Sequence, residues 1–180
     1  MSDAPTFRDT LARGVVVPAC PLALAPERRL DERRQRALIR YYSAAGAGGV
    51  AVGIHTTQFE IHDPETGLLE PVLALAAEEM DRADARRDAP LVRIAGVIGE
   101  TEQAVREAEL AARLGYHAVL LSLAALAEAS DDALLAHCRQ VAQVTPVFGF
   151  YLQPAVGGRV LSHGFWRQFV EIAEIGRAHV

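Results

Sequence analysis

Short apolar segments alternate with amphipathic, helix-like segments along the whole chain. The apolar segments are rich in β-branched residues, as buried strands are, and the segments between them repeat their apolar residues with a helical period. The predicted strands are 14–18, 49–54, 91–98, 117–123 and 146–152. The predicted helices are 31–45, 70–85, 101–114, a segment that begins after Ser130, and 162–172. Five consecutive βα units predict an α/β fold with a parallel sheet and right-handed crossovers.

Local signals mark several of the helix ends. Thr101 and Ser130 precede apolar helical patterns and are predicted to be N-caps, since their hydroxyls can accept a hydrogen bond from a free backbone N–H. Gly46 and Gly115 follow two of the helices and are predicted to end them. The polar stretch 55–67 is too long for a tight turn and is predicted to be a loop.

The turn after the first predicted strand decides between two parallel architectures. A dinucleotide-binding sheet would carry a glycine-rich phosphate turn there, but the chain has Pro18-Ala19-Cys20-Pro21. A (β/α)8 TIM barrel has eight units in about 250 residues. We therefore expect residues 1–174 to be a partial TIM-barrel domain with the first five βα units. Residues 175–180 lack a strand pattern and are expected to be a non-native tail. A complete five-stranded fold with a short natural tail is the alternative.

Composition excludes several classes of function. All 18 basic residues are arginine, so these 180 residues cannot supply a lysine amine for a Schiff base, a pyridoxal enzyme or a phosphate-binding loop. A net charge of −5 argues against a nucleic-acid partner, which needs a basic face. The apolar content of 51% and charged content of 23% are typical of a folded domain.

The cellular location is expected to be the cytoplasm. Cys20 and Cys138 are 118 positions apart and form neither a disulfide framework nor a metal-ligand pattern. The N-terminal residues lack the basic and apolar regions of a signal peptide. No apolar run approaches the ~18 residues of a membrane helix, so no membrane partner is expected.

Two segments at predicted strand ends carry candidate chemistry. Function in parallel α/β folds lies at the carboxyl ends of the strands. Thr56 and Thr57 follow the second strand and offer hydroxyl and N–H groups to a small carboxylate. Tyr151 ends the fifth strand, where a phenol can relay protons, and Gly157 and Gly158 let the backbone approach a ligand. The alternatives are an ordinary turn pair and a tyrosine at the edge of the core.

Taken in order, these and other motifs resemble the dihydrodipicolinate synthase/N-acetylneuraminate lyase family. The resemblance covers about residues 12 to 173 and includes a proline after the first strand and a Gly-rich entry to the second. The matching segments are Cys20-Pro21-Leu22, Leu30-Asp31-Glu32, 45–50, Arg93-Ile94-Ala95-Gly96-Val97, 114–118 and Tyr151-Leu152-Gln153-Pro154.

The resemblance implies a class I aldolase on a (β/α)8 barrel. Such enzymes form a Schiff base between a sixth-strand lysine and pyruvate or another small 2-oxo acid, and they use no cofactor. Carried over, Thr56 and Thr57 would bind the carboxylate and Tyr151 would relay protons. The lysine would lie beyond residue 174, so this chain is expected to be an inactive fragment of a carbon-carbon or carbon-oxygen lyase. The full protein is expected to be a homo-oligomer.

Several departures from the family pattern indicate a divergent member. The segment 53–60 is two residues longer before the threonine pair than the family motif. The family's second tyrosine has no counterpart in 122–126, and Val156 stands at the place of a substrate-binding arginine, with Arg159 three residues further on. These differences argue against a lysine-biosynthetic synthase and favour another substrate, or none.

Two further functions remain open from the sequence. His55, Glu60 and His62 lie in one polar stretch, and imidazole and carboxylate ligands suit a divalent metal in a lyase or hydrolase. A solvated loop is the alternative for that stretch. The other function is a non-catalytic barrel that binds a small acid.

Overall fold

The described part of the chain forms one parallel sheet covered by helices. The computed structural model describes residues 6–54, 56–149, 154, 158–173 and 175, with the backbone alone at 56–58. The strands are β1 (Ala19–Cys20), β2 (Gly49–Val52), β3 (Val92–Val97), β4 (Ala118–Leu121) and β5 (Val147–Phe148), all parallel and in this order. The helices are α1 (Phe7–Ala12), α2 (Glu32–Ala44), α3 (Leu69–Asp84), α4 (Thr101–Arg113), α5 (Asp131–Ala142) and α6 (His163–Phe169), with 3-10 helices η1 (Thr56–His62) and η2 (Ala124–Leu126). The predicted α/β fold of five βα units is confirmed.

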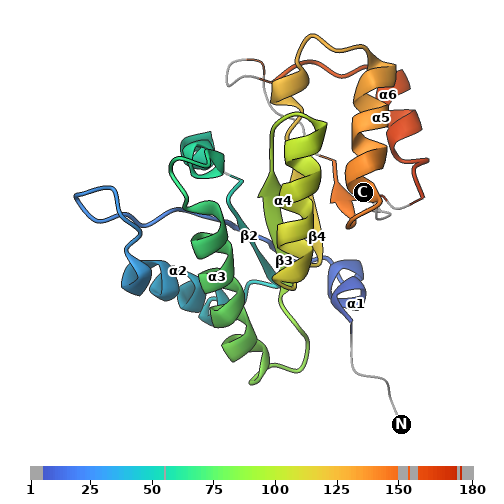
Figure 1. The fold of residues 1–180 in the computed structure, drawn as a ribbon. Helices are drawn as coiled ribbons and strands as arrows, with labels where there is room; N and C mark the ends of the chain where they lie inside the picture. Colours follow the sequence, from blue (N-terminus) through green and yellow to red (C-terminus); the bar gives the residue numbers. More distant parts are fainter. Residues whose placement is uncertain (1–5, 55, 150–153, 155–157, 174, 176–180) are drawn as a thin grey trace.

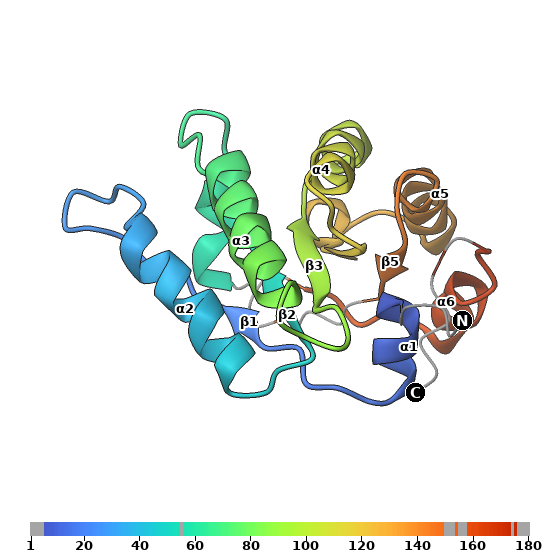
Figure 2. The same ribbon diagram turned by 90° about the horizontal axis from the view of Figure 1, so that it is seen from below.

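The sheet is curved, and its two faces are covered differently. Helices α2 to α5 follow its convex side, and α1 lies on the concave side near the amino ends of the strands (Figures 1 and 2). The main hydrophobic core fills the space between the sheet and the outer helices. A smaller cluster around Ala51, Val92 and Ile94 lies on the other face, with Phe7 and Leu11 of α1 packed against it. This arrangement fits a partial TIM barrel.

Three of the helix-end predictions are confirmed and one is wrong. The Ser130 hydroxyl accepts from the backbone N–H of Ala133 at 3.2 Å. Gly46 and Gly115 have φ of 87° and 78°, a conformation that glycine adopts without strain. Thr101 is instead the first residue of α4, and its hydroxyl lies 2.8 Å from Nδ1 of His137 on α5, so it links two helices.

The first strand begins later than the sequence predicts. The apolar segment 14–18 lies beside the sheet, where the carbonyls of Val16 and Pro18 accept from the N–H groups of Gly48 and Ala51. Pro18 has no N–H to donate in return, so β1 begins only at Ala19.

The sequence pattern also missed α1. This helix has a capping box: the Thr6 N–H donates to Asp9 at 2.7 Å, and the Asp9 N–H donates to the Thr6 hydroxyl at 3.3 Å. The spacing Thr6-x-x-Asp9 is the signal that could have predicted it. At the other end, Ile175 is 5% exposed and belongs to the main core. Residues 176–180 of the expected tail lie outside the described residues.

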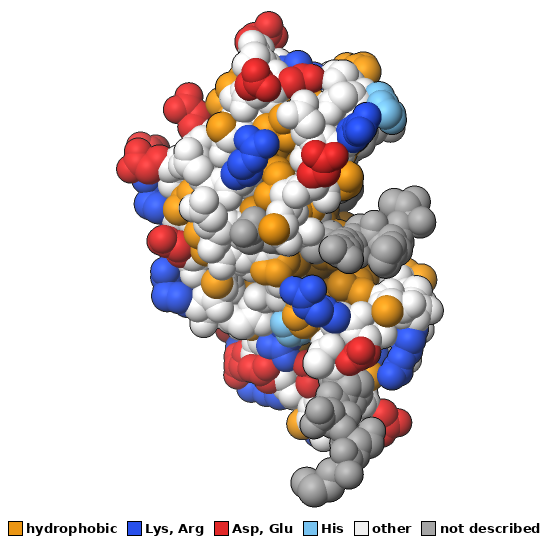
Figure 3. Space-filling model, turned by 90° about the vertical axis from the view of Figure 1, so that its right-hand side faces the viewer, with side chains coloured by type: hydrophobic (Ala, Val, Ile, Leu, Met, Phe, Trp, Pro, Cys, Tyr) orange, Lys and Arg blue, Asp and Glu red, His pale blue; other side chains and the backbone are white. Residues whose placement is uncertain are grey.

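Two observations concern the surface. In the described residues, no helix is both long and apolar enough to cross a membrane. On the face beside α5 and α6, apolar side chains reach the surface across the middle, with charged side chains above and below them (Figure 3). Val160 before α6 and Val170 directly after it are among the exposed apolar residues of the described chain.

Candidate active site

The carboxyl ends of β2, β3 and β4 meet around a small, mostly apolar hollow. Ile54, Phe59 and Leu120 contribute apolar side chains, and Gly96 contributes only backbone. A Cβ at Gly96 would overlap the Gly53 carbonyl, so the ends of β2 and β3 pack backbone against backbone. Ser122 brings the one hydroxyl among the described lining residues, and that oxygen accepts from the Ala124 N–H at 3.4 Å.

The candidate carboxylate-binding residues lie on a short helix beside this hollow. Thr56 and Thr57 begin η1, which replaces the loop that the sequence predicts. Their backbone follows β2 at the carboxyl edge of the sheet, where the sequence places them, and their side chains lie outside the described part of the structure. Their part in carboxylate binding therefore stays a prediction.

The segment after β5 is described only in part. Tyr151, Val156 and Gly157 lie outside the described residues, whereas Gly158 is described and half-buried. The guanidinium of Arg159, three residues after Val156, makes contacts with the loop before α5. It donates to the carbonyls of Ala127 at 2.9 Å and Ala129 at 2.5 Å, and so fixes the loop before α5.

The described members of the metal-ligand alternative have other partners. Glu60 is exposed and pairs with Arg28 at 2.5 Å. The ring of His62 is buried, and both of its nitrogens contact protein acceptors. His55 lies outside the described residues. In the described part of the chain, no three His, Cys, Asp or Glu side chains are grouped as metal ligands.

The buried thiols are not activated nucleophiles. Cys20 ends β1 at the edge that carries the candidate site, and burial raises the pKa of its thiol to about 11. Burial likewise raises the pKa of Cys138 to about 12. Both thiols therefore stay protonated near neutral pH, and a thiolate mechanism is disfavoured.

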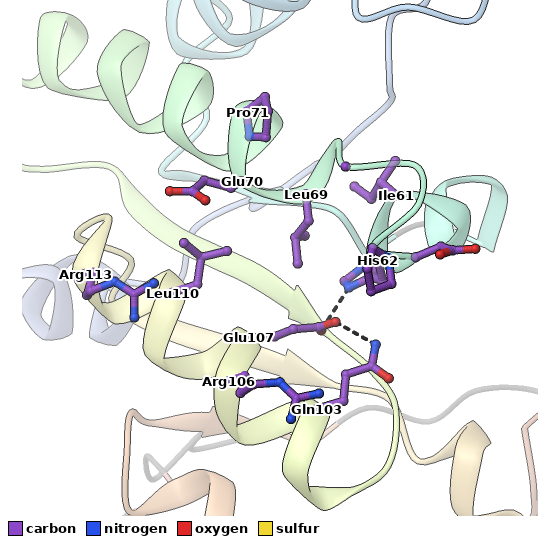
Figure 4. A pocket seen from close by; sticks show the side chains of 13 residues that line it. Ile61, His62, Leu69, Glu70, Pro71, Gln103, Arg106, Glu107, Leu110 and Arg113 are labelled. Carbon is purple, nitrogen blue, oxygen red and sulfur yellow. Dashed lines mark hydrogen bonds and ion pairs between the residues drawn. The ribbon is translucent and has the colours of Figure 1, made fainter.

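Sequence reasoning missed a buried polar network behind η1. Glu107 of α4 accepts hydrogen bonds at both oxygens: Oε1 from Gln103 Nε2 at 2.8 Å and Oε2 from the Ile98 N–H at 3.0 Å. Its Oε2 also lies 2.9 Å from Nδ1 of His62 (Figure 4). Nε2 of His62 lies 3.0 Å from the Gly53 carbonyl oxygen. His62 is 5% and Glu107 7% exposed. We call these two side chains the His62–Glu107 pair.

The contact with Gly53 constrains one proton of the pair. A carbonyl oxygen only accepts, so Nε2 of His62 must carry a proton and donate it to Gly53. Nδ1 lies 2.9 Å from Oε2 of Glu107, within hydrogen-bond distance. Through Gly53 and Ile98, the pair therefore connects the ends of β2 and β3 by hydrogen bonds.

A signal for this network is present in the sequence. The buried residues of α4 are Ala104, Glu107, Ala108 and Ala111, a helical stripe in which Glu107 is the only charged member. A carboxylate on the apolar face of a helix needs a partner, and this requirement could have identified Glu107.

A groove of about 610 Å³ opens over the pair on the outer side of the sheet, between the start of α3 and α4. Figure 4 shows the pair at its base, with Leu110, Arg106 and Arg113 from α4 on one side and Glu70 and Pro71 from α3 on the other. It is separate from the apolar hollow at the strand ends.

Comparisons with known proteins find similar structures but no similar sequences. No protein-family model matches the chain, and no curated protein matches it in sequence. A dihydrodipicolinate synthase from Agrobacterium tumefaciens has 22% identity and a TM-score of 0.74, over 93% of this chain and 54% of that one. N-acetylneuraminate lyase from Fusobacterium nucleatum has 17% identity and a TM-score of 0.68, over 89% and 53%.

A third structure is a prophage protein of the dihydrodipicolinic acid synthase family from E. coli K12, solved in complex with pyruvate. It has 19% identity and a TM-score of 0.71, over 86% of this chain and 50% of that one. The chain thus spans about half the length of these structures. The resemblance expected from the motifs is confirmed at the level of the fold: over that half, the chain has the α/β fold of the dihydrodipicolinate synthase and N-acetylneuraminate lyase structures.

Proposed function

We propose that this chain supplies the carboxylate-binding part of a lyase site for a small 2-oxo acid such as pyruvate. The observation that carries the proposal is the position of η1. The backbone of Thr56 and Thr57 follows the end of β2 by a few residues, at the carboxyl edge of a sheet with the fold of a dihydrodipicolinic acid synthase family protein that was solved with pyruvate. Two threonines can give hydroxyl and backbone donors to one carboxylate, a pattern that suits a small acid.

In the proposed reaction, an amine adds to the keto carbon of the bound acid and water leaves as an imine forms. The phenol of Tyr151 is proposed to carry the proton to the departing oxygen. The 180 residues contain no lysine, so the side-chain amine has to come from outside them. For these residues alone we therefore expect binding of the acid without turnover.

Pyruvate titration of the 180-residue chain tests the proposal, followed by calorimetry or by NMR. Replacing both Thr56 and Thr57 by valine keeps the side-chain shape and removes the hydroxyls. Because a hydrogen bond to a charged group contributes about 1.5–3 kcal/mol, the double variant should bind pyruvate at least roughly tenfold more weakly.

The matched control is Thr66→Val, the same change at an exposed threonine whose backbone N–H donates to the Asp63 carbonyl. It should bind as the unaltered chain does. No pyruvate binding by the unaltered chain, or equal binding by the Thr56/Thr57 double variant, would contradict the proposal.

A second candidate is a barrel that binds a small acid without chemistry. It is favoured by the strand ends around the hollow, where Ser122 offers the only hydroxyl among the described lining residues and no acid or base. Borohydride trapping separates the two in a full-length protein that contains this chain. A lysine adduct with pyruvate supports the lyase, whereas binding without an adduct supports the acid-binding barrel.

A further inference from the structure

One side chain, that of His62, joins the two ends of the segment that carries Thr56 and Thr57. His62 is the last residue of η1, and its Nε2 donates to the carbonyl of Gly53, nine residues earlier and just after β2. Gly53 itself has a φ of 73°, a conformation that turns the chain out of the strand. The candidate carboxylate-binding residues therefore lie in a loop whose start and end are tied together.

Glu107 ties this closed loop to the neighbouring strand. Its Oε2 bonds both to His62 and to the N–H of Ile98, the first residue after β3. Gln103, one turn earlier on α4, donates to the other carboxyl oxygen and fixes the rotation of the carboxyl group. One carboxylate thus sets the position of η1 relative to the end of β3.

Burial shields this connection from solvent. Water competes little with it, since the His62 side chain is 1% and that of Glu107 8% exposed. The charged groups around it come from each neighbouring element: Asp63 after η1, Glu70 on α3, and Arg106 and Arg113 on α4 all line the groove above it. Arg106 pairs with Glu102 at 2.9 Å.

We propose that His62 and Glu107 are positioning residues for carboxylate binding at Thr56 and Thr57. The inference rests on the proposed function and adds to it the groups that hold the site in place. Neither side chain touches the acid. Their contacts instead keep η1 at the strand ends, and a displacement of about 1 Å at such a site can lower function about a hundredfold.

The test compares Glu107→Ala with Asp84→Ala in pyruvate titrations. Asp84 is a partly buried carboxylate at the opposite end of β3. Like Glu107, it accepts a hydrogen bond from a backbone N–H, in this case that of Leu91. Both changes should destabilise the fold, but only Glu107→Ala should weaken pyruvate binding, by roughly tenfold or more. Asp84→Ala should leave the Kd within about twofold, because distant sites act independently.

Two further variants keep the test decisive if Glu107→Ala does not fold. In Glu107→Gln, an amide oxygen at the place of Oε2 can still accept from the Ile98 N–H, so this variant should weaken pyruvate binding less than Glu107→Ala does. His62→Gln cannot bridge Gly53 and Glu107 as the ring does, and it should weaken binding as Glu107→Ala does.

The results separate the two proposals. Unchanged pyruvate affinity in folded Glu107→Ala or His62→Gln overturns the positioning role and leaves the proposed function in place. An equal loss of affinity in Asp84→Ala also overturns the positioning role, since general destabilisation would then explain it. Failure of the unaltered chain to bind pyruvate, or full binding by the Thr56/Thr57 double variant, overturns the proposed function and this inference with it.

Discussion

The two ends of β3 are held by the same kind of contact, made with different chemistry. Before the strand, Asp84 accepts from the Leu91 N–H at 2.8 Å, and after it Glu107 accepts from the Ile98 N–H at 3.0 Å. Asp84 is paired with the guanidinium of Arg93 at 2.6 Å, whereas Glu107 is paired with the imidazole of His62. The carboxylate at one end is therefore paired with a guanidinium, and the carboxylate at the other end with an imidazole.

The histidines at the two ends also differ in the direction of their hydrogen bonds. At the amino end, Nδ1 of His117 accepts a hydrogen bond from the backbone N–H of Arg93 at 3.2 Å, so this nitrogen must be unprotonated. At the carboxyl end, both nitrogens of His62 face acceptors. In parallel α/β barrels, stability residues gather at the amino face and functional residues at the carboxyl face. By this rule, the amino-end contacts of β3 belong to the fold, and the carboxyl-end contacts lie on the face where the proposed site is.

The largest effect on stability should come from the amino end. Asp84→Ala leaves the guanidinium of Arg93, which is 10% exposed, with Asp81 alone, and it frees the Leu91 N–H. Breaking a buried ion pair from one side costs about 3 kcal/mol, and we expect a loss of this size in the free energy of unfolding. Urea denaturation measures it.

The control for that change is the second carboxylate on the same guanidinium. Asp81 contacts Arg93 at 2.7 Å, but its side chain is 68% exposed. Asp81→Ala should therefore cost no more than about 1 kcal/mol. Equal losses for Asp81→Ala and Asp84→Ala would show that burial does not distinguish the two pairs, and the contrast between the ends of β3 would lose its basis.

A smaller effect should appear as pH falls. Burial, and then the nearby charge of Arg93, lower the pKa of His117 below its usual 6.5. A base with a lowered pKa in the folded state adds stability above 6.5, and this stability is lost as pH falls below that value. The unfolding free energy should therefore drop from pH 7 to pH 5, more steeply than in His117→Phe, which keeps a ring to stack on Phe7.

His163 provides the comparison for this pH dependence, since it is exposed at the start of α6. His163→Phe should follow the unaltered chain between pH 7 and pH 5. His137 has a pKa lowered by burial as well, so part of the acid loss should persist in His117→Phe. If His117→Phe leaves the pH dependence of the unfolding free energy unchanged, His117 does not contribute to the pH response.

Much of the fold could be predicted because it follows repeating patterns. Short apolar runs rich in β-branched residues and apolar positions with a helical period predicted all five βα units, and Ser130 caps α5 as its position before an apolar helix predicts. The errors lie where a single residue changes the backbone: Pro18 delays β1, and the Thr6 capping box starts a helix too short to show a period.

The site was harder to predict, since its contacts join residues far apart in sequence. The bond of His62 to Glu107 spans 45 positions, and no local pattern links them. The sequence instead grouped His62 with Glu60 as metal ligands, because the two are close along the chain. Their side chains have different environments: the His62 ring is buried, while Glu60 faces solvent beside Arg28. Neighbours in a polar segment need not share a site when the backbone turns between them.

The smallest effect should come from the exposed ion pair at the same carboxyl end. Arg28 and Glu60 join the loop after β1 to η1 at 2.5 Å, but their side chains are 76% and 77% exposed. Water and salt screen such a pair, and it contributes at most about 1 kcal/mol. Glu60→Gln should therefore change the unfolding free energy by less than about 0.5 kcal/mol and leave pyruvate binding unchanged.

Because Glu60 and His62 lie two residues apart on η1, this variant asks whether the site depends on any ion pair that holds η1 or only on the buried one. If Glu60→Gln lowers pyruvate affinity as much as Glu107→Ala does, then the exposed pair also positions the site. In that case burial does not distinguish the two ion pairs that hold η1.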